Sequence, residues 1–245
     1  MEVIVLAGGL GTRLGELTRK VPKPMLDVSG RPFLAYIFEY LSWCSASKVV
    51  LSVGYQWDVI KSYFGNSFND IRVEYSVEQE PLGTGGAILK ALELVDASDV
   101  LILNGDTLAA VDLRGFHHRH FESKSLFSMA VTSLPDVSRY GRVFFSDDLI
   151  ISGFGEKESG GTGWINCGAY LLNKALLNEY QFGEAFSFEN DLLSKYVQRI
   201  RAQAFPFEGY FLDIGIPSDY ERAQVELPNV MRDLKLTPVL DDENT

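Results

Sequence analysis

The sequence has few residues that could cross-link it or carry it into a membrane. Only two of its 245 residues are cysteine, Cys44 and Cys167, and they form no C-x-x-C motif. This count excludes a disulfide framework and fits a reducing compartment. No apolar run approaches the roughly 20 residues of a membrane-spanning helix, and a strand-like segment directly after Glu2 leaves no room for a signal peptide. We therefore expect a cytoplasmic protein without a membrane partner.

Positive charge is also scarce. The chain has 22 lysines and arginines against 33 aspartates and glutamates, which gives a formal net charge of −11 at pH 7. Such an acidic surface argues against general binding to nucleic acid or to an anionic membrane. If the ligand is nevertheless an anion, the chain must concentrate positive charge locally.

Alternating strand-like and helix-like segments indicate the fold class. Apolar, β-branched runs predict strands at 2–6, 48–53, 71–77, 99–104 and 126–134. Apolar residues at helical spacing predict helices at 31–43, 57–64, 84–95 and 112–121. This order is typical of an α/β fold whose mainly parallel, twisted sheet is flanked by helices on both faces.

The pattern of apolar segments changes after about residue 135, where strand-like segments outnumber helix-like ones. We expect strands at 142–145, 149–154, 164–172 and 203–215, and helices at 187–200 and 217–227. We interpret this half as an extension of the same core. The polar end, 237–245, is expected to fray.

A glycine-rich loop follows the first strand, where LAGGLGTRLGELTRKVPKPML spans 6–26. Gly8, Gly9 and Gly11 allow the backbone to approach an anion and direct N–H groups at it. Two well-known phosphate-binding motifs are absent: G-x-G-x-x-G would need glycine at Leu14, and no glycine is followed by the Lys-Ser/Thr of a P-loop. A tight turn without a ligand is the alternative interpretation.

Two cations follow these glycines and favour an anionic ligand. Arg13 can form two parallel hydrogen bonds with a triphosphate, whereas Lys23 suits a single compact phosphate. Lys23 lies between Pro22 and Pro24. Proline restricts both its own φ and the residue before it, so we expect Lys23 on a stiff, extended segment.

LAGGLGTRL and PKPML together resemble the signature of the sugar-1-phosphate nucleotidyltransferases, GxGTRxxxLTxxxPKP in general form. The resemblance continues through EQEPLGTGGAI, LNGD, YGRV, INCGAYLL and YFLDIGIPSDYERA, and so covers almost the whole chain. Members of that family join a nucleoside triphosphate to a sugar 1-phosphate and release pyrophosphate. The resemblance implies these two partners and a Rossmann-like fold of the nucleotide-diphospho-sugar transferase type, with an added small β-rich sugar-binding part.

The resemblance also implies one nucleotidyltransferase domain over 1–236. Its nucleotide-binding half would be 1–110 and its sugar-phosphate-binding half 111–236. Whether the chain forms a homo-oligomer stays open.

Two aspartates are candidate metal ligands. Asp106 ends the apolar run LILNGD and Asp213 ends YFLD. Ligands of parallel α/β sheets bind beyond the carboxyl ends of the strands, where an oxygen-rich pair with substrate phosphates would suit Mg²⁺. The alternative is that each aspartate caps a helix or a turn. The family holds its Mg²⁺ with aspartates in equivalent positions, and no DxD motif stands at a strand end as a glycosyltransferase would require.

The resemblance assigns further roles residue by residue. Arg13, Lys23 and Asp106 would be catalytic. The implied nucleotide-binding residues are Leu6, Ala7, Gly8, Gly9, Gly11, Thr12, Arg13, Glu78, Pro81, Gly83, Thr84 and Gly105. The implied sugar-phosphate-binding residues are Lys23, Tyr140, Gly141, Glu156, Lys157 and Asn166.

Glu78 occupies a position that resembles a base-recognising residue, which is Gln in many thymidylyl and uridylyl enzymes. A carboxylate only accepts hydrogen bonds at neutral pH, whereas an amide also donates them. Guanine offers two adjacent N–H donors, so Glu78 favours guanine; a solvated surface glutamate is the alternative. The three histidines, in FHHRH at 116–120, are expected on an exposed polar helix without a metal.

Within the family, the short length and stretches such as RPFLAYIFEYL and YFLDIGIPSDYERAQVELP look most similar to the D-glycero-alpha-D-manno-heptose 1-phosphate guanylyltransferases, which serve bacterial surface glycans. A uridylyl-, thymidylyl- or cytidylyltransferase acting on a hexose or amino-sugar 1-phosphate is the alternative. A non-catalytic sensor of nucleotide sugars is an alternative of another class.

Overall fold

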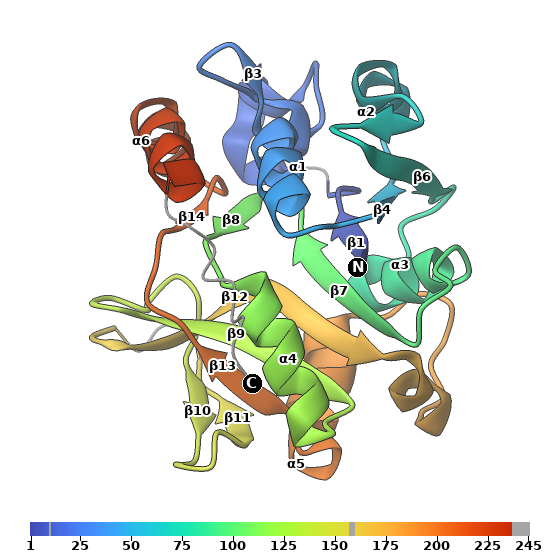
Figure 1. Ribbon diagram of the computed structural model, residues 1–245, viewed down its shortest axis with the longest axis vertical. Helices are drawn as coiled ribbons and strands as arrows, with labels where there is room; N and C mark the ends of the chain where they lie inside the picture. The colour runs from blue at the N-terminus through green and yellow to red at the C-terminus, as the bar shows by residue number, and fades with distance from the viewer. Residues whose placement is uncertain (10, 157–159, 237–245) are drawn as a thin grey trace.

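The computed structural model of the chain describes residues 1–9, 11–156 and 160–236. An eight-stranded sheet crosses the molecule in the order β13-β9-β12-β7-β1-β4-β6-β5 (Figure 1). Its strands are β1 (Glu2–Leu6), β4 (Lys48–Val53), β5 (Ser67–Phe68), β6 (Ile71–Val77), β7 (Asp99–Asn104), β9 (Phe127–Leu134), β12 (Gly163–Asn173) and β13 (Gln203–Pro206). Three two-stranded ribbons pair β2 (Asp27–Val28) with β3 (Arg31–Pro32), β8 (Thr107–Ala109) with β14 (Phe211–Asp213), and β10 (Val143–Phe145) with β11 (Ile151–Phe154).

The helices occupy most of the segments in which helical spacing predicts them. The α-helices are α1 (Phe33–Trp43), α2 (Trp57–Phe64), α3 (Gly83–Leu92), α4 (Leu113–Ser123), α5 (Ser194–Ile200) and α6 (Pro217–Leu236). Short 3-10 helices are η1 (Thr12–Thr18), η2 (Lys23–Met25) and η3 (Lys174–Glu179), and η4 (Phe188–Leu193) is a π-helical turn.

The sheet is mainly parallel, as the alternation of elements predicts. β1 pairs in parallel with β4 and β7, β4 with β6, and β13 with β9. The long strand β12 runs antiparallel between β7 and β9. A parallel pair needs a crossover connection, and helices provide it for the strands of the first half.

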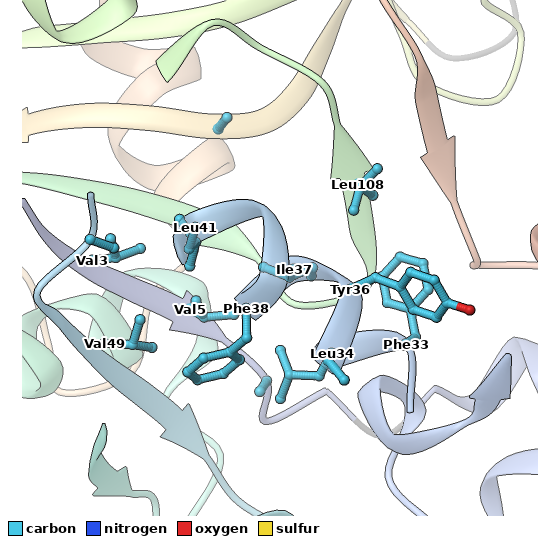
Figure 2. Packing of buried hydrophobic residues seen from close by; sticks show 14 of the residues in the cluster. Val3, Val5, Phe33, Leu34, Tyr36, Ile37, Phe38, Leu41, Val49 and Leu108 are labelled. Atoms are coloured by element: carbon cyan, nitrogen blue, oxygen red, sulfur yellow. The ribbon is translucent and has the colours of Figure 1, made fainter. Parts of the chain in front are cut away.

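Alternating side chains place a separate core on each face of the sheet. Val3 and Val5 of β1 pack into the core that includes α1 and α4, whereas Ile4 packs into the core that includes α3 and α5. Figure 2 shows Phe38 and Leu41 of α1 with Val3 and Val5 in the first core. Successive residues of a strand point to opposite faces, so the apolar run EVIVL supplies both cores and can be covered on both sides.

Two predicted segments differ in the structure. The run 203–215 contains two strands, β13 in the main sheet and β14 in a ribbon. The histidine cluster is only partly exposed, because His120 is 2% exposed and lies 2.7 Å from Ser128 Oγ through Nδ1 and 3.3 Å from Asp99 Oδ1 through Nε2. The expectation of an exposed helix was therefore wrong for His120, because the sequence did not indicate which side of α4 faces the core.

The order of strands creates a switch point next to β1. The chain passes from β1 outward to β4 and β6, then crosses back to β7 on the other side of β1. Loops that leave adjacent strands in opposite directions open a crevice at their carboxyl ends, where ligands of such sheets bind. No helix among the described residues is long and apolar enough to cross a membrane.

Candidate active site

The glycine loop passes directly over Lys23. Gly11 has a φ of 63°, and a Cβ built on it would lie 3.0 Å from Lys23 Cβ and 2.9 Å from a methyl carbon of Thr18. Glycine tolerates both this left-handed backbone and this close approach. The Thr18 hydroxyl donates a hydrogen bond to the Gly11 carbonyl at 3.1 Å and fastens the loop.

A cavity of about 730 Å³ opens at the carboxyl ends of β1, β4, β6 and β7. A volume of this size can hold a nucleotide-sized ligand. Eight of the residues predicted from the sequence to bind nucleotide or metal line it: Leu6, Gly8, Gly9, Glu78, Pro81, Gly83, Thr84 and Asp106. The four strand ends therefore converge on one space, as the switch point implies.

A buried lysine lies between two carboxylates at the edge of this cavity. Lys23 Nζ is 2.6 Å from Asp106 Oδ2 and 3.6 Å from Asp213 Oδ1, and the Lys23 side chain is 6% exposed. Burial, and then the neighbouring Asp106 charge, raise the pKa of the Asp213 carboxyl. Lys23, Arg13 and Arg139 act in the opposite direction on this pKa, so three cations lie near Asp213.

Asp213 reaches Asp106 by a different route from the one that the sequence suggests. Asp213 does not end a strand of the main sheet; it ends β14, whose antiparallel partner β8 begins just after Asp106. The register pairs Asp213 with Thr107, and the Ile214 N–H donates to the Asp106 carbonyl at 3.0 Å. The ribbon therefore holds the two carboxylates together, whereas the sequence suggested that two parallel strand ends would do so.

The environment of Lys23 also differs from the prediction. Pro22 is extended, but Lys23 begins the 3-10 helix η2 and is buried. Pro24 takes the second position of this helix, where its missing N–H has no intrahelical acceptor to satisfy. The prolines thus set a tight turn that directs Lys23 inward.

The residues at this point fit a divalent cation that substrate phosphates help to hold. Asp213 Oδ1 is buried and makes no hydrogen bond with the described residues, so it keeps an acceptor for a cation. Within 1–9, 11–156 and 160–236, no group of three or more His, Cys, Asp or Glu side chains could hold a metal by itself. Asp106 and Asp213 can supply two oxygens, and a hard cation such as Mg²⁺ takes its other oxygens from phosphates and water.

Arg13 is exposed and lies beside the same carboxylates. A Cβ on Gly215 would stand 3.3 Å from Arg13 Nη2 and 2.9 Å from Asp213 Oδ1. Arg13 is therefore close to the charged centre although it does not line the cavity. Of the other predicted nucleotide ligands, Ala7, Gly11, Thr12 and Gly105 also lie outside the cavity lining.

Glu78 lies at the end of β6, facing the glycine loop. Its carboxylate accepts hydrogen bonds from the Ser52 hydroxyl at 3.2 Å and from the Leu82 N–H at 3.1 Å. A Cβ on Gly8 would stand 3.0 Å from Glu78 Oε1. Each carboxylate oxygen has a second lone pair, so Glu78 can accept further hydrogen bonds from a ligand in the cavity.

The glycines of EPLGTGGAI have a packing role that the sequence did not indicate. A Cβ on Gly83 would lie 2.6 Å from the Phe186 carbonyl oxygen, and one on Gly86 would lie 2.3 Å from the Glu184 carbonyl oxygen. The Phe186 ring leaves equally little room at Gly85. These glycines therefore let the segment before η4 lie directly on the start of α3.

The predicted sugar-phosphate ligands are only partly brought together. The Tyr140 ring packs edge-on against Phe211 of β14 at 5.5 Å, and Gly141 follows with a φ of 78°. Asn166 Nδ2 donates to the Tyr170 hydroxyl at 2.8 Å. Glu156 is exposed after β11, and Lys157 lies outside the described residues.

Several residues of the site went unpredicted. Ser52 and Asn104 line the cavity from the ends of β4 and β7. Their position could have been predicted, because ligands of parallel α/β sheets bind at the carboxyl ends of the strands. Arg139 lies 2.6 Å from the buried Asp219 at the start of α6 and fastens the loop of Tyr140 to that helix. Glu189 lines the cavity from η4, and no pattern in the sequence marks it.

Comparisons with known proteins give the chain's relatives. The model of the Nucleotidyl transferase family matches residues 2–229. The chain is 45% identical to D-glycero-alpha-D-manno-heptose 1-phosphate guanylyltransferase of Aneurinibacillus thermoaerophilus, over 93% of this chain and 98% of the relative, and 41% identical to the protein of the same name from Campylobacter jejuni, over 90% and 97%.

A solved structure is similar to the chain in both fold and sequence. HddC from Yersinia pseudotuberculosis superposes with a TM-score of 0.82 at 38% identity, covering 91% of this chain and 97% of HddC. HddC complexed with GMP-PN superposes with a TM-score of 0.81. With the family match, these likenesses show that the chain belongs to the nucleotidyl transferase family.

Proposed function

We propose that the chain transfers a guanylyl group from GTP to D-glycero-alpha-D-manno-heptose 1-phosphate and releases pyrophosphate. The names of the two relatives and the nucleotide analogue bound to HddC support the substrates. One observation carries the reaction type: the buried Lys23 ammonium between Asp106 and Asp213 at the edge of a nucleotide-sized cavity. Two carboxylates and a lysine at one point suit the handling of phosphates and their cation.

In this proposal the two substrates occupy opposite sides of Lys23. The triphosphate lies along the glycine loop, with its base toward Glu78 and Gly83. The sugar phosphate lies toward Tyr140, Gly141 and Asn166, and Glu156 contacts the sugar. Lys157, expected to hold the sugar phosphate, is outside the described residues. The nucleotide-binding half of the single domain is then 1–110 and the sugar-phosphate half 111–236.

The chemistry requires two polyanions to meet. When bound, Mg²⁺ supplies charge neutralisation and orientation of the phosphates. Arg13 and Lys23 contribute fixed positive charge where negative charge accumulates as an oxygen of the sugar phosphate attacks the α-phosphorus. Because the second pKa of a phosphate ester is about 6, this oxygen is mostly deprotonated at neutral pH and needs no general base.

Glu78 supports guanine as the base. Its carboxylate has lone pairs left after the hydrogen bonds from Ser52 and Leu82, and guanine presents two adjacent N–H donors. Uracil and thymine present one donor between two acceptors, which a carboxylate matches less well.

The cysteines bear on where the reaction takes place. Cys44 and Cys167 are free thiols, which supports a reducing compartment, and we place the reaction in the cytoplasm.

A pyrophosphate-release assay tests the proposal. GTP, ATP, UTP, CTP and dTTP are each combined with heptose, mannose, glucose and N-acetylglucosamine 1-phosphates, in the presence of Mg²⁺ or of EDTA. We expect the highest kcat/KM for GTP with the heptose phosphate and no turnover in EDTA. A preference for UTP or dTTP contradicts the role of Glu78. No pyrophosphate release with any substrate pair favours a sensor of nucleotide sugars.

A further inference from the structure

Glu189 lines the cavity, yet none of the roles above uses it. It belongs to η4, a π-helical turn of six residues between the loop after η3 and α5. Single π-helical turns are rare and frequently occur at functional sites. The geometry around Glu189 indicates what this one does.

The neighbours of Glu189 determine where its side chain points. Phe188 is buried, and its ring lies 5.6 Å from that of Phe127 and 5.8 Å from that of Tyr170. The Ser187 hydroxyl accepts a hydrogen bond from the Asn190 N–H at 3.1 Å and caps the turn. With Phe188 fixed in the core and Ser187 at the cap, Glu189 is left to face the cavity.

The glycines of α3 bring this turn to the nucleotide side of the cavity. The Gly85 N–H donates to the Phe186 carbonyl at 2.9 Å, and the Phe186 N–H donates to the Leu82 carbonyl at 3.0 Å. A methyl group on Gly83 or Gly86 would collide with this segment. The start of α3 therefore has no side chains at the point where the segment before η4 crosses it.

Thr84 is the direct contact between the two elements. Its hydroxyl donates a hydrogen bond to Glu189 Oε2 at 2.6 Å and accepts one from the Phe188 N–H at 2.9 Å. The Thr84 hydroxyl thus uses its proton on Glu189 and one lone pair on Phe188. These two hydrogen bonds to η4 set its orientation.

On the other side, the turn that carries Glu189 packs against β12. The ring of Phe188, next to Glu189, lies 5.8 Å from the ring of Tyr170, whose hydroxyl accepts a hydrogen bond from Asn166 Nδ2 at 2.8 Å. Burial raises the pKa of Tyr170, and the nearby charge of Glu189 adds to the rise. The turn η4 therefore contacts Thr84 on α3 through Glu189 and Tyr170 on β12 through Phe188.

We propose that Glu189 is a positioning residue that anchors η4 to Thr84 on the nucleotide side of the cavity, so that the adjoining Phe188 supports Tyr170 and Asn166 on the sugar side. The inference rests on the proposed function, because it assigns Thr84 and Asn166 to the two substrates. A carboxylate suits this position because its charged Oε2 accepts from the Thr84 hydroxyl at 2.6 Å and from the Ser187 hydroxyl at 3.4 Å, and it carries no N–H that could face these donors. These hydrogen bonds hold η4 against α3.

The test is Glu189→Gln, with Glu184→Gln as the matched control. The control makes the same chemical change on the same segment, at an exposed side chain outside the cavity lining. We expect kcat of Glu189→Gln to fall by about ten- to a hundredfold, since a neutral amide accepts a weaker hydrogen bond from the Thr84 hydroxyl than a carboxylate does and can turn its N–H toward that hydroxyl. Both KM values should stay within about twofold, because an orienting contact affects the transition state more than binding. Glu184→Gln should match the wild type.

Two further measurements separate orientation from folding. Hydrogen exchange of the substrate-free protein should be about threefold faster or more at the Phe188 amide in Glu189→Gln, since Thr84 is held less firmly. Thr84→Val combined with Glu189→Gln should cost about as much kcat as either change alone, because both break one connection.

The results distinguish this inference from the proposed function. A kcat within twofold of the wild type, a matching loss in Glu184→Gln, or a change confined to one KM would overturn the role of Glu189 while the function stands. A wild-type protein that turns over no pair of substrates would overturn the function itself. Multiplicative losses in the double variant would also contradict the connection through Thr84.

Discussion

At the residue scale, charge is concentrated at one buried point of an acidic protein. The chain carries a formal net charge of −11, yet Lys23, Arg13 and Arg139 all lie close enough to Asp213 to oppose the rise of its pKa. Burial of a carboxylate such as that of Asp213 is unfavourable unless cations accompany it. In the protein without substrates, the Lys23 ammonium supplies the compensating positive charge. In the proposed function, the substrate phosphates bind together with Mg²⁺.

Asp106→Asn should abolish turnover while the fold stays intact. The amide removes the negative charge that faces Lys23 at 2.6 Å and weakens the proposed cation site, to which the described residues contribute two carboxylates. We expect pyrophosphate release to fall by about a hundredfold or more, with an unchanged far-UV circular dichroism spectrum. Asp147→Asn, in the exposed turn between β10 and β11, is the control. Near wild-type activity of Asp106→Asn in Mg²⁺ would refute the metal assignment.

Lys23→Ala should mainly raise the KM for the sugar phosphate. Hydrogen bonds to charged groups contribute about 1.5–3 kcal/mol, so we expect a rise of about ten- to a hundredfold. Steady-state kinetics with each substrate varied in turn measures it, and the exposed Lys20→Ala is the control. An effect confined to the nucleotide would contradict the role of Lys23.

At the element scale, the glycines of α3 decide how closely η4 approaches. Glycine in a helix is normally unfavourable relative to alanine, by about 1 kcal/mol. In α3 the opposite should hold, because a Cβ on Gly86 would come within 2.3 Å of a backbone oxygen. The steric term is larger than the helix propensity, so the sequence keeps glycine where propensity favours alanine.

Gly86→Ala should therefore destabilise the protein. Overpacking of this kind lowers the free energy of unfolding by about 1–3 kcal/mol, which urea unfolding followed by fluorescence can measure. Gly153→Ala in β11 is the control, since a Cβ there meets nothing within 4 Å. A Gly86→Ala variant as stable as the wild type would show that the segment before η4 can move away at little energetic expense.

His120 of α4 provides a pH-dependent contribution to stability. Burial lowers the pKa of His120 below its ordinary value of 6.5, although the Asp99 carboxylate acts against this. The unfolded chain therefore binds a proton more readily than the folded protein. The contribution is fully present above pH 6.5 and is lost as the pH falls below that value toward the lowered pKa.

The thermal midpoint of the wild type should accordingly decrease between pH 7.5 and pH 5.5. His120→Gln should weaken this decrease, whereas His118→Gln, at an exposed side chain, should leave it unchanged. Differential scanning calorimetry across this range measures both. Parallel curves for the wild type and His120→Gln would assign the pH dependence to other groups.

At the scale of the whole molecule, one sheet connects the parts of the site. β1, β4, β6 and β7 bring together the side of the cavity that we propose binds the nucleotide, and β12 joins β7 directly on the same sheet. The two sides are therefore rigidly related through backbone hydrogen bonds between β7 and β12. Side chains such as Glu189 need only adjust a distance that the sheet has already limited.

Local patterns in the sequence predicted much of this arrangement. Alternating apolar strands and amphipathic helices indicated the parallel sheet, and the glycines with Arg13 and Lys23 indicated the loop that we propose binds the substrate phosphates. These features depend on neighbours within a few residues, where propensity and spacing act. The prediction of an extended Lys23 was wrong because Pro24 also fits the second position of a 3-10 helix.

The sequence by itself determined the class of sheet, the residue types of the charged centre and the family signature that carries them. Only the tertiary structure decided that Asp213 meets Asp106 through the β8–β14 ribbon, and that Glu189 meets Thr84 across 105 residues. Contacts between distant segments depend on register and on close packing, which leave no periodic trace in the chain. They exist only once both cores have closed around the sheet.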